Sequence, residues 1–147
     1  MTRYAENTSV PVDRSRTEIE RQLQRFGATG FGYGWEGSVE VIAFTYRAKQ
    51  VRLTLPMPSP SGFRTEAARE KERRRRWRSL AMVIKALLVG VDDDIISFEE
   101  AFLSYFVMPD GMTLGERLLP GLEVAAREGK LPQLMLPSGA MREAGRG

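Results

Sequence analysis

The side chains best suited to bind a ligand form a basic run near the middle of the chain. The run holds five arginines: Arg73, Arg74, Arg75, Arg76 and Arg78. A helix turns by about 100° per residue, so four successive arginines spread over about 300° of its surface. The acids of the same helix cannot pair with all of them, and we expect at least two arginines to contact an outside partner. Guanidinium groups bind phosphate through paired hydrogen bonds, which predicts contact with a nucleic-acid backbone.

The alternative interpretation of this run is a solvated helix face that is partly self-paired. Positions 66–78 carry seven basic and three acidic residues. The whole chain has 22 Lys and Arg residues against 19 Asp and Glu, for a net charge of +3. So small a net charge does not require an anionic partner, and any argument depends on where the charges gather. Trp77 likewise has two interpretations, as a stacking face for a base or as the first core residue of its helix.

A second set of candidate contacts lies in the predicted sheet. Arg47 and Arg52 should point away from the core, and Lys49 should lie at the tip of a hairpin, so that all three extend a phosphate track. Tyr33 and Trp35 alternate with glycines, and their rings are candidates for stacking on bases. The alternatives are ordinary solvent-side alternation for the three cations and core packing for the two aromatic residues.

The chain contains no cysteine and no histidine. Disulfides, ordinary zinc sites and an imidazole base are therefore excluded, together with the hydrolases and nucleases that need them. Carboxylates at positions 92–94, 99 and 100 are oxygen ligands of the kind that Mg²⁺ takes. A sequential run rarely converges on one ion, and helix termination followed by negative charge on the next helix explains the pattern better. We expect no catalytic residue, no metal and no cofactor.

Hydrophobic periodicity predicts the elements that must position these residues. Residues 1–12 are predicted to be extended. A capping box at Ser15 and Glu18 begins a short helix that ends at Gly27. Alternating apolar residues then predict three antiparallel strands joined by short connections, at 31–35, 39–47 and 51–55.

A long helix is predicted from residue 66 to about residue 89. From Trp77 onward it carries an apolar stripe that should pack on the sheet, whereas the part before Trp77 should lie on the surface. The last helix should turn Leu118, Leu122 and Ala125 inward. The predicted elements after the long helix are two helices at 98–107 and 114–128, an extended strap at 131–137 and a disordered tail at 138–147.

The expected fold class is α+β, with a three-stranded antiparallel meander backed by an N-terminal helix, the long helix and two C-terminal helices. A chain of 147 residues suits one domain, expected over residues 1–137. The chain shows no apolar segment typical of a signal peptide or a membrane span. We therefore expect a cytoplasmic protein.

Several blocks of the sequence resemble a family of uncharacterised small proteins found in phages and prophages. The blocks are 8–12 (TSVPV), 14–16 (RSR), 18–20 (EIE), 25–29 (RFGAT), 52–56 (RLTLP), 76–85 (RWRSLAMVIK), 98–103 (FEEAFL) and 109–111 (PDG). The resemblance extends to about residue 136 and implies a mobile-element protein in the host cytoplasm. The order of one helix, three strands and a long helix also resembles double-stranded-RNA-binding domains and single-strand-annealing proteins, although the long helix lacks a Lys-Lys pair at its start.

These observations together predict a non-catalytic protein that binds nucleic acid as an accessory factor of a phage or mobile element. DNA is favoured over RNA, and the strand type stays open. Homo-oligomerisation is expected to extend the short basic surface. Two alternatives remain, a module that binds or inhibits a host protein and a nuclease that holds metal through carboxylates.

Overall fold

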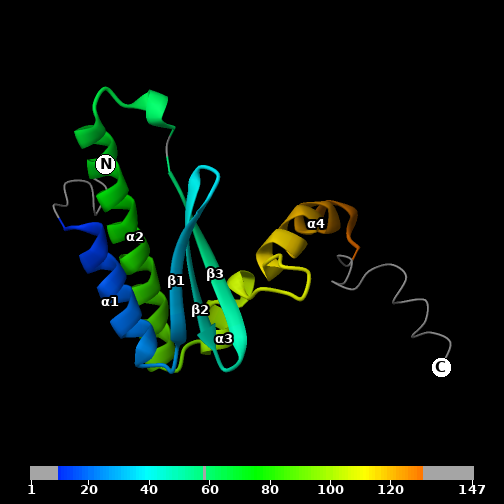
Figure 1. The fold of residues 1–147 in the computed structure, drawn as a ribbon. Coiled ribbons are helices and arrows are strands. Elements are labelled where there is room, and N and C mark those ends of the chain that lie inside the picture. The colour runs from blue at the N-terminus through cyan, green and yellow to red at the C-terminus, as the bar shows by residue number, and fades with distance from the viewer. Residues whose placement is uncertain (1–9, 58, 131–147) are drawn as a thin grey trace.

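The computed structural model describes residues 10–57 and 59–130, and it has the expected α+β architecture (Figure 1). The elements in chain order are α1 (Val12–Gln24), β1 (Thr29–Glu36), β2 (Val39–Tyr46), β3 (Lys49–Pro56), η1 (Pro60–Gly62), α2 (Glu66–Asp92), α3 (Phe98–Ala101), η2 (Leu103–Tyr105) and α4 (Leu114–Glu128). The predicted strap at 131–137 and the predicted tail at 138–147 lie outside the described residues.

The three strands form one antiparallel sheet in the order β1-β2-β3. Ile42 lies opposite Tyr33 on one side and Leu53 on the other, so these three residues share a face. Ile42, Phe44 and Tyr46 are buried on that face, as their alternation predicts. The turn between β2 and β3 is tight because both of its central residues adopt positive φ, a conformation whose twist matches that of the strands.

Helices α1 and α2 lie side by side and cover the apolar face of the sheet (Figure 1). Ile19 and Leu23 of α1 are fully buried against this core. Trp77 of α2 is also fully buried and begins the apolar stripe of that helix, as predicted. The ion pairs Glu18–Arg78 and Arg25–Asp92 join the two helices in the same order, so they run parallel.

The start of α1 corrects one prediction. The helix begins at Val12, three residues before the predicted capping box at Ser15. Pro11 takes the N-cap position with a φ of −60°, and a proline at a helix start loses no hydrogen bond because the first N–H groups have no partner within the helix. Ser15 is buried in the first turn instead of capping it.

The region after α2 corrects two further predictions. The helix expected at 98–107 is a single α-turn, α3, followed by η2 and an extended segment. Phe106 forms a bridge with Val51, and the Val107 N–H donates to the Gln50 carbonyl, because the outer edge of β3 offers these groups a backbone partner. Helix α4 projects away from the sheet (Figure 1), and Leu122, expected to face inward, is 54% exposed.

Candidate nucleic-acid interface

A buried carboxylate, Glu40 in β2, organises the centre of the charged region. Its side chain is fully buried and shares a sheet face with Ile42. The Nε and Nη2 groups of Arg73 donate to its two oxygens at 2.9 and 2.7 Å, and Arg16 donates to Oε1 at 3.3 Å. Burying an ion requires such compensation, so one carboxylate fastens α1 and α2 to the sheet. Its hydrogen bonds with Arg73 hold the pKa of that guanidinium above its usual value.

Two aromatic rings pack against Arg16, the arginine of α1 that contacts Glu40. The Arg16 guanidinium lies 4.4 Å from the centre of the Tyr33 ring and 4.6 Å from that of Trp77. Tyr33 and Trp77 themselves meet edge to face at 5.9 Å. Burial, and next the negative charge of Glu20, raises the pKa of the Tyr33 hydroxyl well above its usual range, so the group stays neutral. Tyr33 therefore packs within the fold and does not present its ring as an open stacking face.

Most arginines of the basic run have carboxylate partners. Arg75 and Arg76 both donate to Glu72, and Arg76 also donates to the Pro56 carbonyl at 2.6 Å. The two guanidinium groups hold the pKa of Glu72 at about 2, far below its ordinary 4.5, with the hydrogen bond from Arg75 as the largest cause. Arg78 pairs with Glu18 of α1.

Arg74 differs from the other four arginines because no ion pair joins it to any described residue. Its Nε is buried without a hydrogen-bond partner among the described atoms. At least two arginines were expected to find a partner outside their helix. For Arg73 and Arg78 that partner is a carboxylate elsewhere in the fold, Glu40 of β2 and Glu18 of α1, which a count of the acids of α2 alone does not include.

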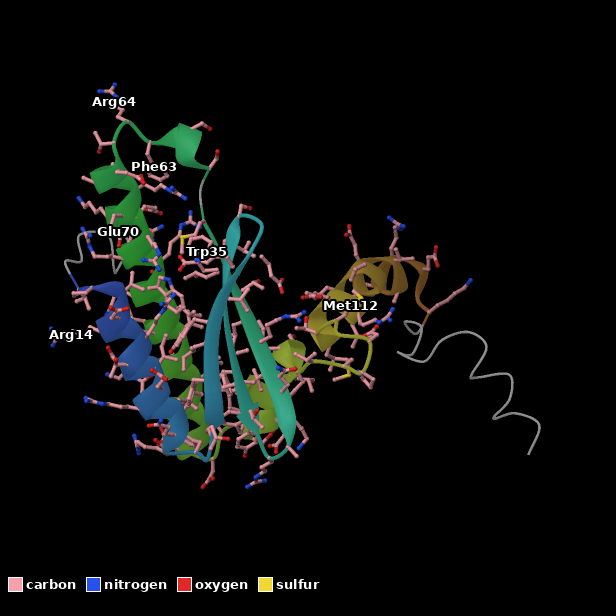
Figure 2. All side chains as sticks on the ribbon, viewed as in Figure 1. Arg14, Trp35, Phe63, Arg64, Glu70 and Met112 are labelled. Carbon is pink, nitrogen blue, oxygen red and sulfur yellow. The ribbon has the colours of Figure 1, made fainter. Side chains whose placement is uncertain are left out.

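Arg74 belongs to a basic stripe along the side of α2 that faces α1. The stripe follows helical spacing and consists of Lys71, Arg74, Arg78 and Lys85. On α1, Arg14 and Arg21 flank Glu18 at i−4 and i+3, and the Glu18–Arg78 ion pair joins the two stripes. Figure 2 shows the Arg14 side chain extended away from α1.

We call the unpaired cations of these two stripes the basic face. It consists of Arg14, Arg21, Lys71, Arg74 and Lys85, none of which has an ion-pair partner among the described residues. Four of them are exposed and Arg74 is half-buried. Apart from Arg74, the sequence interpretation missed these residues. Plotting the cations of both helices at 100° per residue would have aligned them.

The sheet cations do not join the basic face. Arg47 pairs with Glu99 at 3.7 Å, and Arg52 donates to Glu116 of α4 at 3.2 Å. Lys49 begins β3 next to the β2–β3 turn and is exposed. This turn lies near the end of α2, opposite the end where the basic run begins (Figure 1). The structure therefore does not place these three residues in one continuous track with residues 73–76.

Trp35 lies apart from the other aromatic residues. It is 56% exposed at the end of β1, and its ring centre lies 5.9 Å from the Arg73 guanidinium. A cavity of about 330 Å³ opens beside it. The cavity is lined by Trp35, Met57, Glu66, Arg69, Glu70 and Arg73. Figure 2 shows Trp35 between the β1–β2 turn and α2, with Glu70 on the helix side.

The acidic run does not assemble a metal site among the described residues. Asp92 pairs with Arg25, and Glu99 pairs with Arg47. Glu100 completes a capping box with Ser97, whose hydrogen bonds lower the pKa of the Glu100 carboxyl. In residues 10–57 and 59–130, no group of three or more acidic side chains could hold a metal ion.

None of the helices in the described part of the chain is both long and apolar enough to cross a membrane. Comparison of the chain with protein-family models, with curated proteins and with solved structures finds no match. The resemblance to phage-encoded proteins therefore stays a prediction.

Proposed function

We propose that this protein binds nucleic acid without cleaving it, through the basic face formed by α1 and α2. The observation that carries the proposal is the set of five cations on adjoining stripes, none of which has an ion-pair partner among the described residues. Cations that are free to contact phosphates release condensed counterions from nucleic acid, and this release supplies much of the binding free energy.

The paired arginines have a different role in this proposal. Arg73 is held by Glu40, which is fully buried, and leaving that carboxylate without a partner would be costly. Arg75 and Arg76 share Glu72 of the same helix, and Arg76 also donates to the Pro56 carbonyl at the end of β3. Arg73 and Arg76 thus fix the position of α2, while Lys71 and Arg74 of the same helix contact phosphates.

The fold bears on the type of nucleic acid that this surface binds. The order α1-β1-β2-β3-α2, with both helices on one face, is similar to that of double-stranded-RNA-binding domains, which read duplex shape through backbone contacts. The resemblance to phage-encoded proteins favours DNA, as in an accessory protein of phage DNA metabolism. The test therefore compares single- and double-stranded DNA with single- and double-stranded RNA.

Fluorescence anisotropy with labelled oligonucleotides across a salt series tests this proposal. If all five cations contact phosphates of a duplex, the logarithm of the affinity falls with the logarithm of salt concentration with a slope of about −4.5. Lys71→Gln and Arg74→Gln each make the slope shallower by about one. Lys49→Gln is the matched control, because Lys49 is exposed and lies outside the basic face.

A further inference from the structure

The cavity beside Trp35 holds a combination of groups that the basic face does not explain. Its walls come from the end of β1, the residue after β3 and the first two turns of α2. Its volume of about 330 Å³ falls within the range of small-molecule sites. It contains an exposed indole, a thioether, two guanidinium groups and two carboxylates.

The charges around this cavity balance each other. Arg69 lies 3.7 Å from Glu66, and the Arg73 Nη1 lies 3.5 Å from Glu70. A phosphate would meet two carboxylates as well as two cations, so the cavity does not suit an anion. A neutral, flat ring with polar edges suits it better, because the ring can lie on the indole while its edge meets charged hydrogen-bonding groups.

We propose that this cavity binds one unstacked nucleobase, with its ring on Trp35 and its polar edge toward Glu66 and Glu70. The proposal rests on the proposed function and names the part of the nucleic acid that enters the site. Trp35 has more than half of its side chain exposed, and Arg73, itself fixed by Glu40, lies beside its ring. An indole held in this way is a platform on which a base can stack.

The carboxylates determine which base fits best. Guanine carries two adjacent N–H donors on its Watson–Crick edge, and a carboxylate can accept both at once. Adenine, cytosine and thymine do not offer such a pair of donors on this edge. The site therefore prefers guanine. Glu66, with 84% of its side chain exposed, and Glu70, with 49%, are both accessible to a ligand.

The cavity and the basic face lie on different sides of the same turns of α2. Arg69 and Arg73 line the cavity, whereas Lys71 and Arg74 lie on the side that faces α1. Arg64 lies just before the helix and points outward at its start (Figure 2). A single strand that places one base in the cavity can thus cross the start of α2. Its neighbouring phosphates then lie near Arg64, Lys71 and Arg74.

The two tryptophans of the chain make this proposal directly measurable. Trp77 is fully buried and Trp35 is 56% exposed, so a base that stacks in the cavity quenches the fluorescence of Trp35 alone. The titrants are five-nucleotide DNAs with a central guanine, adenine, cytosine or thymine between thymines, together with free guanosine. We expect the guanine strand to bind most tightly and to quench most strongly.

Three variants separate the contributions. Trp35→Ala should weaken binding of the guanine strand by about 5- to 150-fold and remove the base preference. The double variant Glu66→Gln with Glu70→Gln should lose the guanine preference. Glu36→Gln is the matched control, because this exposed carboxylate lies next to Trp35 in sequence but does not line the cavity.

The outcomes distinguish this proposal from the proposed function. If all strands bind with equal, salt-dependent affinity and Trp35→Ala changes nothing, the cavity proposal is overturned and nucleic-acid binding stands. If no strand binds at low salt but guanosine quenches Trp35 in the wild-type protein, the cavity binds a base and the proposed function fails. If neither the strands nor guanosine quench Trp35, the cavity proposal is overturned.

Discussion

Glu40 changes the role that the sequence suggests for Arg73. A local count of charges leaves this arginine in excess, and the structure places its partner 33 positions earlier, on β2. The signal was present in the pattern of the strand, because Glu40 shares the face of Ile42 and Phe44, and a carboxylate on a buried face must find a cation. The pattern predicts that a partner exists, but the identity of the partner depends on tertiary packing.

Substitution of Glu40 tests whether its ion pairs with Arg16 and Arg73 hold α1 and α2 on the sheet. Glu40→Gln leaves Arg16 without its negative partner and leaves Arg73 with Glu70 alone, and we expect it to lower the free energy of unfolding by about 3–5 kcal/mol. Urea unfolding monitored by circular dichroism measures the change. Glu66→Gln, at a carboxylate with 84% of its side chain exposed, should change the value by less than about 0.5 kcal/mol. A loss of less than about 1 kcal/mol of unfolding free energy for Glu40→Gln would contradict this role of Glu40.

Glu72 makes part of the stability dependent on pH. Its folded-state pKa of about 2 lies below the ordinary 4.5, so its contribution is complete above pH 4.5 and disappears as the pH falls toward 2. Between pH 6 and pH 3, the wild-type protein should therefore lose more unfolding free energy than Glu72→Gln. Urea unfolding at the two pH values measures this difference, with Glu123→Gln on exposed α4 as control. Equal losses in the wild type and Glu72→Gln would refute the role of this carboxylate.

At the scale of elements, hydrophobic periodicity predicts an element correctly where that element packs on the sheet. The three strands and the division of α2 at Trp77 agree with the prediction, because the apolar stripe and the core that it faces are both local features. Residues 98–107 were assigned wrongly, because Phe102 and Phe106 are buried in an irregular segment that periodicity alone reads as helix. An amphipathic pattern shows that a face is apolar, but it does not show what covers that face.

Helix α4 provides the test at this scale. Leu122 of α4 and Leu88 of α2 are the same residue type on apolar helix stripes, but Leu122 is 54% exposed and Leu88 is 4% exposed. Leu88→Ala should lower the free energy of unfolding by about 2–5 kcal/mol, whereas Leu122→Ala should lower it by less than about 0.5 kcal/mol. Parallel urea titrations of the two variants measure both values. Equal losses would mean that α4 packs inward, as the periodicity alone predicts.

At the scale of the whole molecule, ion pairing decides which cations are available. The sequence identified a basic helix correctly, but it could not identify the available cations, since partners such as Glu18 and Glu40 are distant in the chain. Most arginines of the basic run are held in ion pairs. The cations without an ion-pair partner among the described residues are scattered along the sequence. The parallel packing of α1 and α2 then brings these scattered cations together as the basic face.

The salt dependence of nucleic-acid binding tests the central claim most directly. In fluorescence anisotropy titrations, we predict binding at low salt and a steep loss of affinity as the salt concentration rises. The slope should become shallower by about one in Arg74→Gln and stay unchanged in Lys49→Gln. Absence of binding to every form of DNA and RNA at low salt, or equal slopes in the wild type and Arg74→Gln, would contradict the assignment of the basic face.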